Sequence, residues 1–203
     1  MTQVSILNYQ AGNLYSIRNA LRRAGASVEV VSVEDLFECD ALVIPGVGHF
    51  GAAIKNIRPA MDRIRGLIDS GVPVLGICLG LQILFSSSEE GPSTGLDCIS
   101  GRVVRLPESV KIPHIGWNRV KRKRESVLLD ESDDNSWFYF VHSFVGNPTD
   151  ISVVTGETQY GILFPSIVET GSLYATQFHP EKSGPAGFRL LKRFVRVAKE
   201  AGA

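Results

Sequence analysis

The first half of the chain alternates short apolar runs with segments of helical periodicity. Apolar runs occur at residues 4–9, 27–33, 41–46 and 73–78. Between them the pattern predicts a helix from about Asn13 to Ala24 and a helical region from about Phe50 to Ser70, in which Pro59 fits the first turn of a second helix. This βαβ alternation is typical of a parallel sheet that is covered on both faces.

After Gly91 the pattern changes to the period-two alternation of strands, separated by Gly, Pro, Asn and Asp turns. Strand-like runs lie at residues 99–106, 116–123, 126–129, 137–144, 151–155, 161–169 and 172–178. From about Gly184 an apolar face predicts a closing helix. We therefore expect an α/β fold with a mostly parallel central sheet, to which the second half adds antiparallel hairpins.

The composition favours one soluble domain. With 203 residues and 44% apolar content, the chain is long enough for one substantial core, and no linker or repeat indicates a second domain within residues 1–203. The 21 basic and 21 acidic residues balance, which gives no electrostatic argument for nucleic acid or an anionic membrane as a partner. No signal peptide and no apolar run of roughly 18 residues is present, so we expect a cytoplasmic protein.

The charged runs and the Cys and His residues of this sequence do not by themselves indicate a nucleic-acid or metal site. The basic run 121–124 and the acidic run 130–134 fit the two sides of a solvated hairpin. Three cysteines form no CxxC pair and the four histidines are scattered, so we expect neither a disulfide scaffold nor a metal site.

One cysteine, Cys78, stands at the junction of a predicted strand (72–77) and a predicted helix (79–85). Such a strand-to-helix elbow strains the backbone of its central residue, and Gly76 and Gly80 have no Cβ to obstruct the approach of strand and helix. The sulfur would project above the sheet edge at a helix N-terminus, which favours the thiolate over the thiol. The residues alone leave two readings open: a nucleophile, or a small buried hydrophobe, which is our expectation for Cys39 and Cys98.

Two further segments supply the groups that a nucleophilic thiol requires. His179 and Glu181 flank Pro180 after an apolar strand, so the carboxylate can orient one imidazole nitrogen while the other faces the thiol. In PGVG, Gly46 and Gly48 allow backbone N–H groups to turn toward an oxyanion, with the N–H of Leu79 as the second donor. Taken alone, the His-Pro-Glu segment is also compatible with a surface turn. The PGVG segment alone is also compatible with a phosphate site or a plain connection.

Together, GICLGLQ, HPE and PGVG resemble the class I glutamine amidotransferases, over essentially the whole chain. The resemblance implies a three-layer α/β sandwich in which Cys78 is the nucleophile, His179 the general base and acid, and Glu181 the residue that orients His179. It also implies a thioester mechanism without metal or organic cofactor, an oxyanion loop at Gly46, Val47 and Gly48, and a glutamine head group held by Gln82 and the backbone of Ser143 and Phe144. Tyrosine is more usual in the family at position 144, so the role of its hydroxyl is lost here.

Three other stretches resemble one subfamily, the glutaminase subunits of imidazole glycerol phosphate synthases in histidine biosynthesis: NYQAGN (8–13), PHIGWN (113–118) and YFVHSF (139–144). The resemblance implies a heterodimer in which ammonia passes to a (β/α)8-barrel cyclase subunit. Asn13, Trp117 and Tyr139 are then candidate interface residues, although turn or core packing would also explain them. Because two glycines make peptide rotation easy, the PGVG peptide would rest in a nonproductive orientation until the partner binds its substrate.

Other functions remain open at this point. A glutaminase of another class I amidotransferase, such as that of pyridoxal phosphate synthase, and a cysteine variant of an α/β hydrolase share the elbow, but PHIGWN and YFVHSF count against both. A noncatalytic scaffold would use the same sheet edge for binding while the triad residues merely pack.

Overall fold

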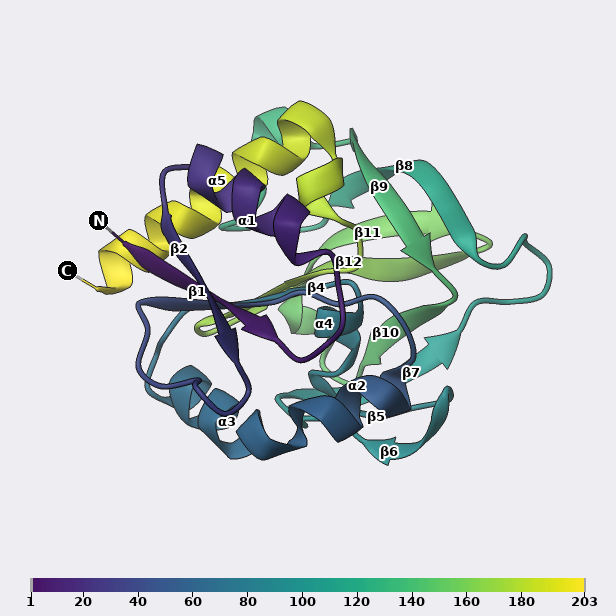
Figure 1. The fold of residues 1–203 in the computed structure, drawn as a ribbon. Helices are drawn as coiled ribbons and strands as arrows, with labels where there is room; N and C mark the ends of the chain where they lie inside the picture. The colour runs from purple at the N-terminus through teal and green to yellow at the C-terminus, as the bar shows by residue number, and fades with distance from the viewer. Residues whose placement is uncertain (1, 203) are drawn as a thin grey trace.

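A large twisted sheet forms the centre of the computed structural model, which describes residues 2–202 (Figure 1). Its strand order within that range is β2-β1-β3-β4-β13-β12-β11-β8-β9. The first five strands pair in parallel, and the remaining pairs are antiparallel. The strands are β1 (Gln3–Asn8), β2 (Ser27–Ser32), β3 (Ala41–Ile44), β4 (Val74–Ile77), β8 (His114–Arg122), β9 (Ser136–His142), β11 (Val154–Tyr160), β12 (Ile162–Thr170) and β13 (Leu173–Thr176). The expected α/β sheet with antiparallel additions is confirmed.

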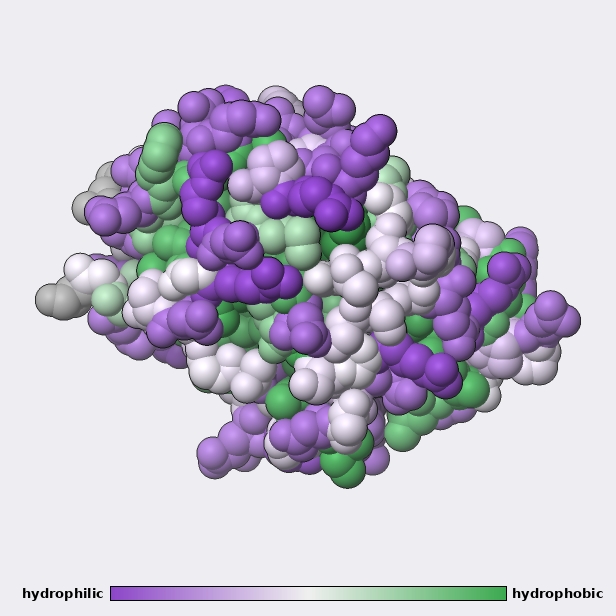
Figure 2. All heavy atoms as spheres, turned by 90° about the horizontal axis from the view of Figure 1, so that it is seen from below, coloured by the Kyte–Doolittle hydropathy of each residue, from purple (hydrophilic) through white to green (hydrophobic). Residues whose placement is uncertain are grey.

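Helices cover both faces of this sheet. Helices α1 (Leu14–Arg23) and α5 (Gly184–Ala201) lie on one face, and α2 (Phe50–Ile57) and α3 (Met61–Asp69) lie on the other (Figure 1). A separate apolar core fills each interface, with Leu21 and Phe194 in one and Phe50 and Ile64 in the other. The face seen from the side of α2 and α3 is mostly hydrophilic, with scattered hydrophobic groups (Figure 2). Within residues 2–202, no helix has the length and apolarity that a membrane crossing demands.

The helical region from Phe50 to Ser70 divides at the proline. Helix α2 ends at Ile57, a 3₁₀ turn η1 (Arg58–Ala60) contains Pro59, and α3 begins at Met61. Proline has no N–H to donate to the preceding turn, so the first helix stops before it. The predicted division into two helices is confirmed, although Pro59 lies in the 3₁₀ turn before α3 and not in the first turn of α3 itself.

A second, four-stranded sheet was not predicted, and its presence corrects the expected helix over residues 79–85. The helix α4 spans only Leu79–Gln82, and Phe85 begins a strand. The carbonyl of Ile83 accepts the N–H of Leu96, and that of Leu84 accepts the N–H groups of Cys98 and Ile99, so these carbonyls are not available to a longer helix. The second sheet has the order β10-β7-β5-β6, formed by β5 (Phe85–Ser88), β6 (Gly91–Thr94), β7 (Ile99–Arg105) and β10 (Phe144–Pro148).

Two predicted strands also require correction. Residues 126–129 form a loop, because the Glu169 carboxylate accepts hydrogen bonds from the Ser126 hydroxyl and from the N–H groups of Val127 and Leu128. Residues 151–153 form the 3₁₀ turn η3 (Ile151–Val153), and β11 begins only at Val154. In both places a carboxylate, that of Glu169 or of the capping Asp150, accepts backbone N–H groups that a strand would donate to its neighbour.

The acidic run 130–134 lies in the connection between β8 and β9 and is solvated as expected, except at Asp133. It forms the 3₁₀ turn η2 (Glu131–Asp133), and Asp133 is fully buried. The Asp133 carboxylate lies 2.5 Å from the guanidinium groups of both Arg189 and Arg193 on α5. Two guanidinium groups at this distance compensate the desolvation of one carboxylate, so an acidic residue joins the turn to the closing helix.

Removal of the Asp133 carboxylate should destabilise the fold. In Asp133→Ala the two arginines lose a buried partner, and we expect the free energy of unfolding to fall by about 2–3 kcal/mol, less than for a fully enclosed pair because Arg189 can regain water. Urea denaturation measures the change. Glu131→Ala is the matched control, since that carboxylate is 97% exposed and lies 4.0 Å from Arg122. Equal stability of the two variants would contradict this account of the turn.

Candidate active site

Cys78 forms the sharp turn between β4 and α4. Its backbone has φ 55° and ψ −104°, a positive-φ conformation that is strained for a residue with a side chain. Close packing around the turn requires glycine on either side. A Cβ on Gly76 would lie 2.8 Å from the Gly80 carbonyl oxygen, and a Cβ on Gly80 would overlap the Ile44 carbonyl. The predicted strained elbow is therefore confirmed.

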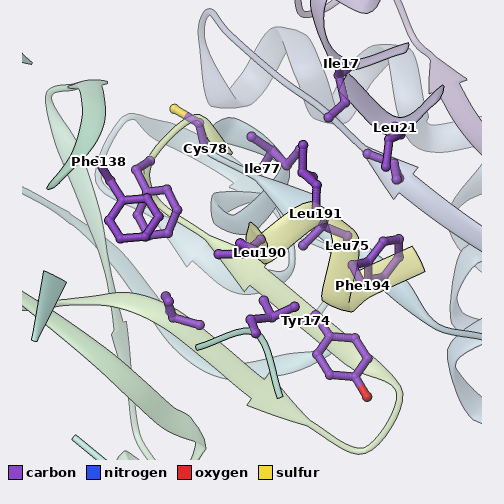
Figure 3. Close-up of a cluster of buried hydrophobic side chains, with 14 of the residues drawn as sticks. Ile17, Leu21, Leu75, Ile77, Cys78, Phe138, Tyr174, Leu190, Leu191 and Phe194 are labelled. Atoms are coloured by element: carbon purple, nitrogen blue, oxygen red, sulfur yellow. The ribbon is translucent and has the colours of Figure 1, made fainter. Parts of the chain in front are cut away.

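Cys78 is only 5% exposed and lies at the margin of the apolar core, where it also lines a pocket. In the close-up its side chain points away from Leu190 and Leu191, although Ile77 immediately before it packs toward them (Figure 3). The Cys78 N–H donates to the Thr176 carbonyl at 2.7 Å, which ties the turn to β13. Because α4 has only four residues, the helix dipole that we expected to favour a thiolate contributes little.

His179 and Glu181 form a buried hydrogen-bonded pair at the end of β13. The 3₁₀ turn η4 (Pro180–Lys182) brings His179 Nδ1 to 3.0 Å from Glu181 Oε1, and both side chains are about 95% buried, with exposures of 4% and 5%. Burial alone would lower the pKa of His179, but the Cys78 and Glu181 side chains outweigh it and raise this pKa to about 10. The imidazole is thus held by the Glu181 carboxylate at Nδ1, while its Nε2 is buried and has no hydrogen-bond partner within the described residues.

A pocket of about 230 Å³ opens beside Cys78. Of the residues predicted to bind substrate, it is lined by Val47, Gly48, Leu79, Gln82, Ser143 and Phe144. Gly46, His179 and Glu181 are not part of this lining. Sequence reasoning missed Glu90, Pro113, Val141 and His142, which also line the pocket. Glu90 could not be found from its local pattern, because it reaches the pocket through the unpredicted second sheet.

In the predicted oxyanion loop, residues 46–48, one backbone hydrogen bond sets the direction of the Gly46–Val47 peptide. The N–H of Leu79 donates to the carbonyl of Gly46 at 3.4 Å. In a trans peptide the carbonyl and the following N–H point in opposite directions, so the N–H of Val47 faces away from that of Leu79. The two donors that we expected to share an oxyanion therefore do not converge in this conformation.

The floor of the pocket is fixed by hydrogen bonds to the carbonyl of Phe144. Gln82 Nε2 donates to this oxygen at 2.9 Å and lies 3.3 Å from Gln177 Oε1. His142 Nδ1 lies 3.0 Å from the same carbonyl. Gln82 thus orients the Phe144 backbone in addition to facing the pocket.

His142 also contacts a second buried histidine. His114 Nδ1 lies 3.1 Å from His142 Nε2, and the rings of Tyr160 and His114 stack with centroids 3.9 Å apart. Burial lowers the pKa of His114 to about 4. Burial, together with the charge that His114 would carry, lowers the pKa of His142 to about 3. Both rings are therefore neutral at neutral pH. No group of three or more metal-ligating residues that could hold an ion occurs within the described part of the chain.

The three candidate interface residues occupy different settings. Asn13 is exposed and caps α1 by accepting the N–H of Ser16 at 3.2 Å. Trp117 and Tyr139 are cross-strand neighbours on β8 and β9, with ring centroids 6.0 Å apart. Trp117 is 52% exposed, whereas Tyr139 is half-buried and its carbonyl accepts the N–H of His179 at 2.9 Å.

A thiol at a strained elbow, beside a His–Glu pair and a pocket, is an arrangement that suits a thiol-dependent acyl-transfer enzyme. The family model of class I glutamine amidotransferases matches residues 5–198, and the chain belongs to this family. A solved structure described as a glutamine amidotransferase has the same fold, with a TM-score of 0.76 and 23% identity over 97% of this chain and 98% of that one.

Two relatives narrow the assignment. Imidazole glycerol phosphate synthase subunit HisH of Methanocaldococcus jannaschii is 43% identical over 96% of this chain and 99% of its own length. The protein of the same name from Archaeoglobus fulgidus is 48% identical over 97% of this chain and 99% of its own length. Within the amidotransferases, the chain belongs to the HisH family.

The neutral histidine pair should make the fold sensitive to mild acid. An unfolded histidine takes up a proton near pH 6.5, whereas His114 and His142 resist protonation until about pH 4 and 3, so the free energy of unfolding falls as the pH falls through this window. The raised pKa of His179 opposes this trend only in part, because the stability that it contributes is already nearly complete at pH 6.5 and is lost mainly above that pH. We expect a net loss of about 3 kcal/mol between pH 7 and pH 5 in urea denaturation.

Two variants attribute this loss to the histidines. His114→Gln should show a smaller decrease between the two pH values. Tyr160→Phe, which removes the hydroxyl bonded to the Lys111 carbonyl but keeps both histidines, should retain the full decrease. A wild-type stability that is flat across this range would overturn the interpretation.

Proposed function

We propose that this chain is the glutaminase subunit of an imidazole glycerol phosphate synthase. The observation that carries the proposal is the strained Cys78 elbow, beside the glutamine-sized pocket and backed by the buried His179–Glu181 pair. We further propose that residues 1–203 act as one cytoplasmic glutaminase domain.

In the proposed first half-reaction, the Cys78 thiolate attacks the side-chain amide carbon of glutamine and forms a C–S bond. The amide oxygen becomes an oxyanion. As the oxyanion collapses, the C–N bond breaks and protonated His179 gives its proton to the departing nitrogen, which leaves as ammonia. A γ-glutamyl thioester remains on Cys78.

In the second half-reaction, His179 takes a proton from a water molecule, which attacks the thioester carbon. The C–S bond breaks, and the Cys78 thiolate and the γ-carboxylic acid form while His179 remains protonated. The acid loses the second proton of the water to solvent and leaves as glutamate. Glu181 orients the imidazole throughout and stabilises its positive charge. The sequence of steps uses side chains of this chain and water.

The pocket offers groups for both ends of glutamine. Gln82 and the Ser143–Phe144 backbone lie beside Cys78, where the reacting amide must sit. Glu90 is the acidic side chain of the pocket lining and suits the substrate's α-ammonium group, and its Oε2 is positioned by the N–H of Phe50 at 2.7 Å. The free N–H groups of the oxyanion loop would complete the site after rotation of the Gly46–Val47 peptide.

The partner that we propose is a (β/α)8-barrel cyclase subunit. Two relatives are named as subunits of a synthase, which implies a second subunit. An exposed apolar face on β8 and β9, with Ile115, Trp117 and Trp137, lies beside the pocket wall formed by Pro113 and Val141. Ammonia would pass from this edge to the cyclase, which adds it to a phosphorylated ribulosyl formimino compound and yields imidazole glycerol phosphate and an aminoimidazole carboxamide ribonucleotide.

Glutamate release, measured with and without a cyclase subunit and its ligand, tests the proposal. The loop geometry predicts little turnover by the isolated chain and strong stimulation in the complex. Cys78→Ser should lower stimulated turnover by a factor on the order of 10⁴ or more, because the triad acts as a unit. Cys98→Ser, a thiol outside the pocket, should retain it. Turnover in Cys78→Ser would refute the assignment, and full activity of the isolated chain would refute the resting loop.

The pH dependence tests the roles of His179 and Glu181. Glu181 raises the pKa of His179, so Glu181→Gln should lower it. Imidazolium, the acid for departing ammonia, is then lost at a lower pH, and the alkaline limb of kcat/KM should move to lower pH while kcat falls by roughly 10²-fold or more. Glu157→Gln, at an ion pair with Lys123 elsewhere, should leave the profile unchanged. An unmoved alkaline limb in Glu181→Gln would argue against this pairing.

A further inference from the structure

Tyr9 is a buried tyrosine with no role in the chemistry described above. It follows β1 directly and is 1% exposed. Its hydroxyl donates to the carbonyl of Pro45 at 2.5 Å, and its own carbonyl accepts Asn56 Nδ2 at 3.1 Å. Burial raises the pKa of Tyr9, and the nearby charge of Cys78 raises it further. The hydroxyl therefore stays protonated and remains a donor.

The Pro45 carbonyl belongs to the peptide that immediately precedes the Gly46–Val47 peptide of the oxyanion loop. Tyr9 holds this preceding peptide through its hydroxyl. There is no room for a side chain at Gly46: a Cβ there would overlap the Tyr9 hydroxyl and would lie 2.8 Å from the Leu79 Cβ. Gly46 is thus enclosed between Tyr9 and the residue that supplies the other oxyanion donor.

The chain segment that carries Tyr9 also packs on this peptide. Gly12 has φ +107°, and a Cβ there would lie 3.4 Å from both the Gly46 nitrogen and the Pro45 Cβ. The loop that follows β1 therefore clamps the Pro45–Gly46 peptide at two points, the Tyr9 hydroxyl and Gly12. Its end, Asn13, begins α1 at the surface.

From this geometry we propose that Tyr9 is a positioning residue for the oxyanion hole. Its hydroxyl fixes the Pro45–Gly46 peptide, so rotation is confined to the Gly46–Val47 peptide. The Val47 N–H then arrives beside the N–H of Leu79 instead of at a range of positions. The inference rests on the proposed glutaminase function and assigns a residue that acts through the loop, without touching glutamine.

Tyr9→Phe keeps the ring and removes the donor. In the complex with cyclase and its ligand, we expect stimulated kcat to fall by roughly 10- to 100-fold, because a misplaced donor weakens transition-state stabilisation. KM for glutamine should stay within about 3-fold, since ground-state contacts are untouched. Tyr174→Phe, at a buried tyrosine on β13, is the matched control and should keep kcat. Thermal unfolding of each variant identifies a temperature at which all are folded.

The rate of Cys78 alkylation by iodoacetamide separates positioning from a general disturbance of the site. Alkylation displaces iodide at a saturated carbon and forms no oxyanion, so Tyr9→Phe should react at the parent rate in the complex. Parent kcat in Tyr9→Phe would overturn the inference, as would slowed alkylation, which would place its effect on the thiol. Turnover in Cys78→Ser would instead overturn the proposed function, so the two failures are distinguishable.

Discussion

The close contact between β4 and α4 is the constraint on which the rest of the site depends. Gly76 and Gly80 bring the strand and the short helix so close that a Cβ at either position would meet backbone atoms. The one residue that can complete the reversal between them, Cys78, is forced into positive φ. The turn places the sulfur at the sheet edge, where the apolar core meets the pocket. The parallel pairing of β4 with β13 on one side and β3 on the other then sets which groups can reach it.

The buried histidines near this sheet edge have pKa values that are shifted in opposite directions. His179 is buried against a carboxylate and a thiol, and its pKa rises to about 10. His114 and His142 are buried against each other and against aromatic rings, and their pKa values fall to about 4 and 3. Burial lowers the pKa of each ring, and only at His179 do neighbouring side chains outweigh it. A protonated imidazole therefore lies beside the thiol, while the residues that orient the pocket backbone remain neutral.

Much of this arrangement followed from the sequence because it depends on local rules. The glycines around Cys78 predicted the elbow, the spacing of His179 and Glu181 predicted their contact, and Pro59 predicted the division between α2 and α3. The second sheet did not follow, since the strand at Phe85 is fixed by pairing with residues beyond position 95, and such pairing leaves no local pattern. For the same reason Glu90 and the buried Asp133 were missed or misread: distant chain segments, not neighbours in sequence, determine their surroundings.

The site combines fixed and movable parts in a way that suits control by a second protein. The elbow, the His179–Glu181 pair and the Phe144 carbonyl are each held by several hydrogen bonds or close contacts. The Gly46–Val47 peptide is held in its resting orientation by a single 3.4 Å hydrogen bond from Leu79, which has a net value of only about 1 kcal/mol. A ligand or partner shifts an equilibrium by the difference in its affinity for the two states, so a differential affinity of a few kcal/mol is enough to turn this peptide. In the proposed mechanism, regulation therefore acts on the oxyanion donor while Cys78 and the His179–Glu181 pair stay in place.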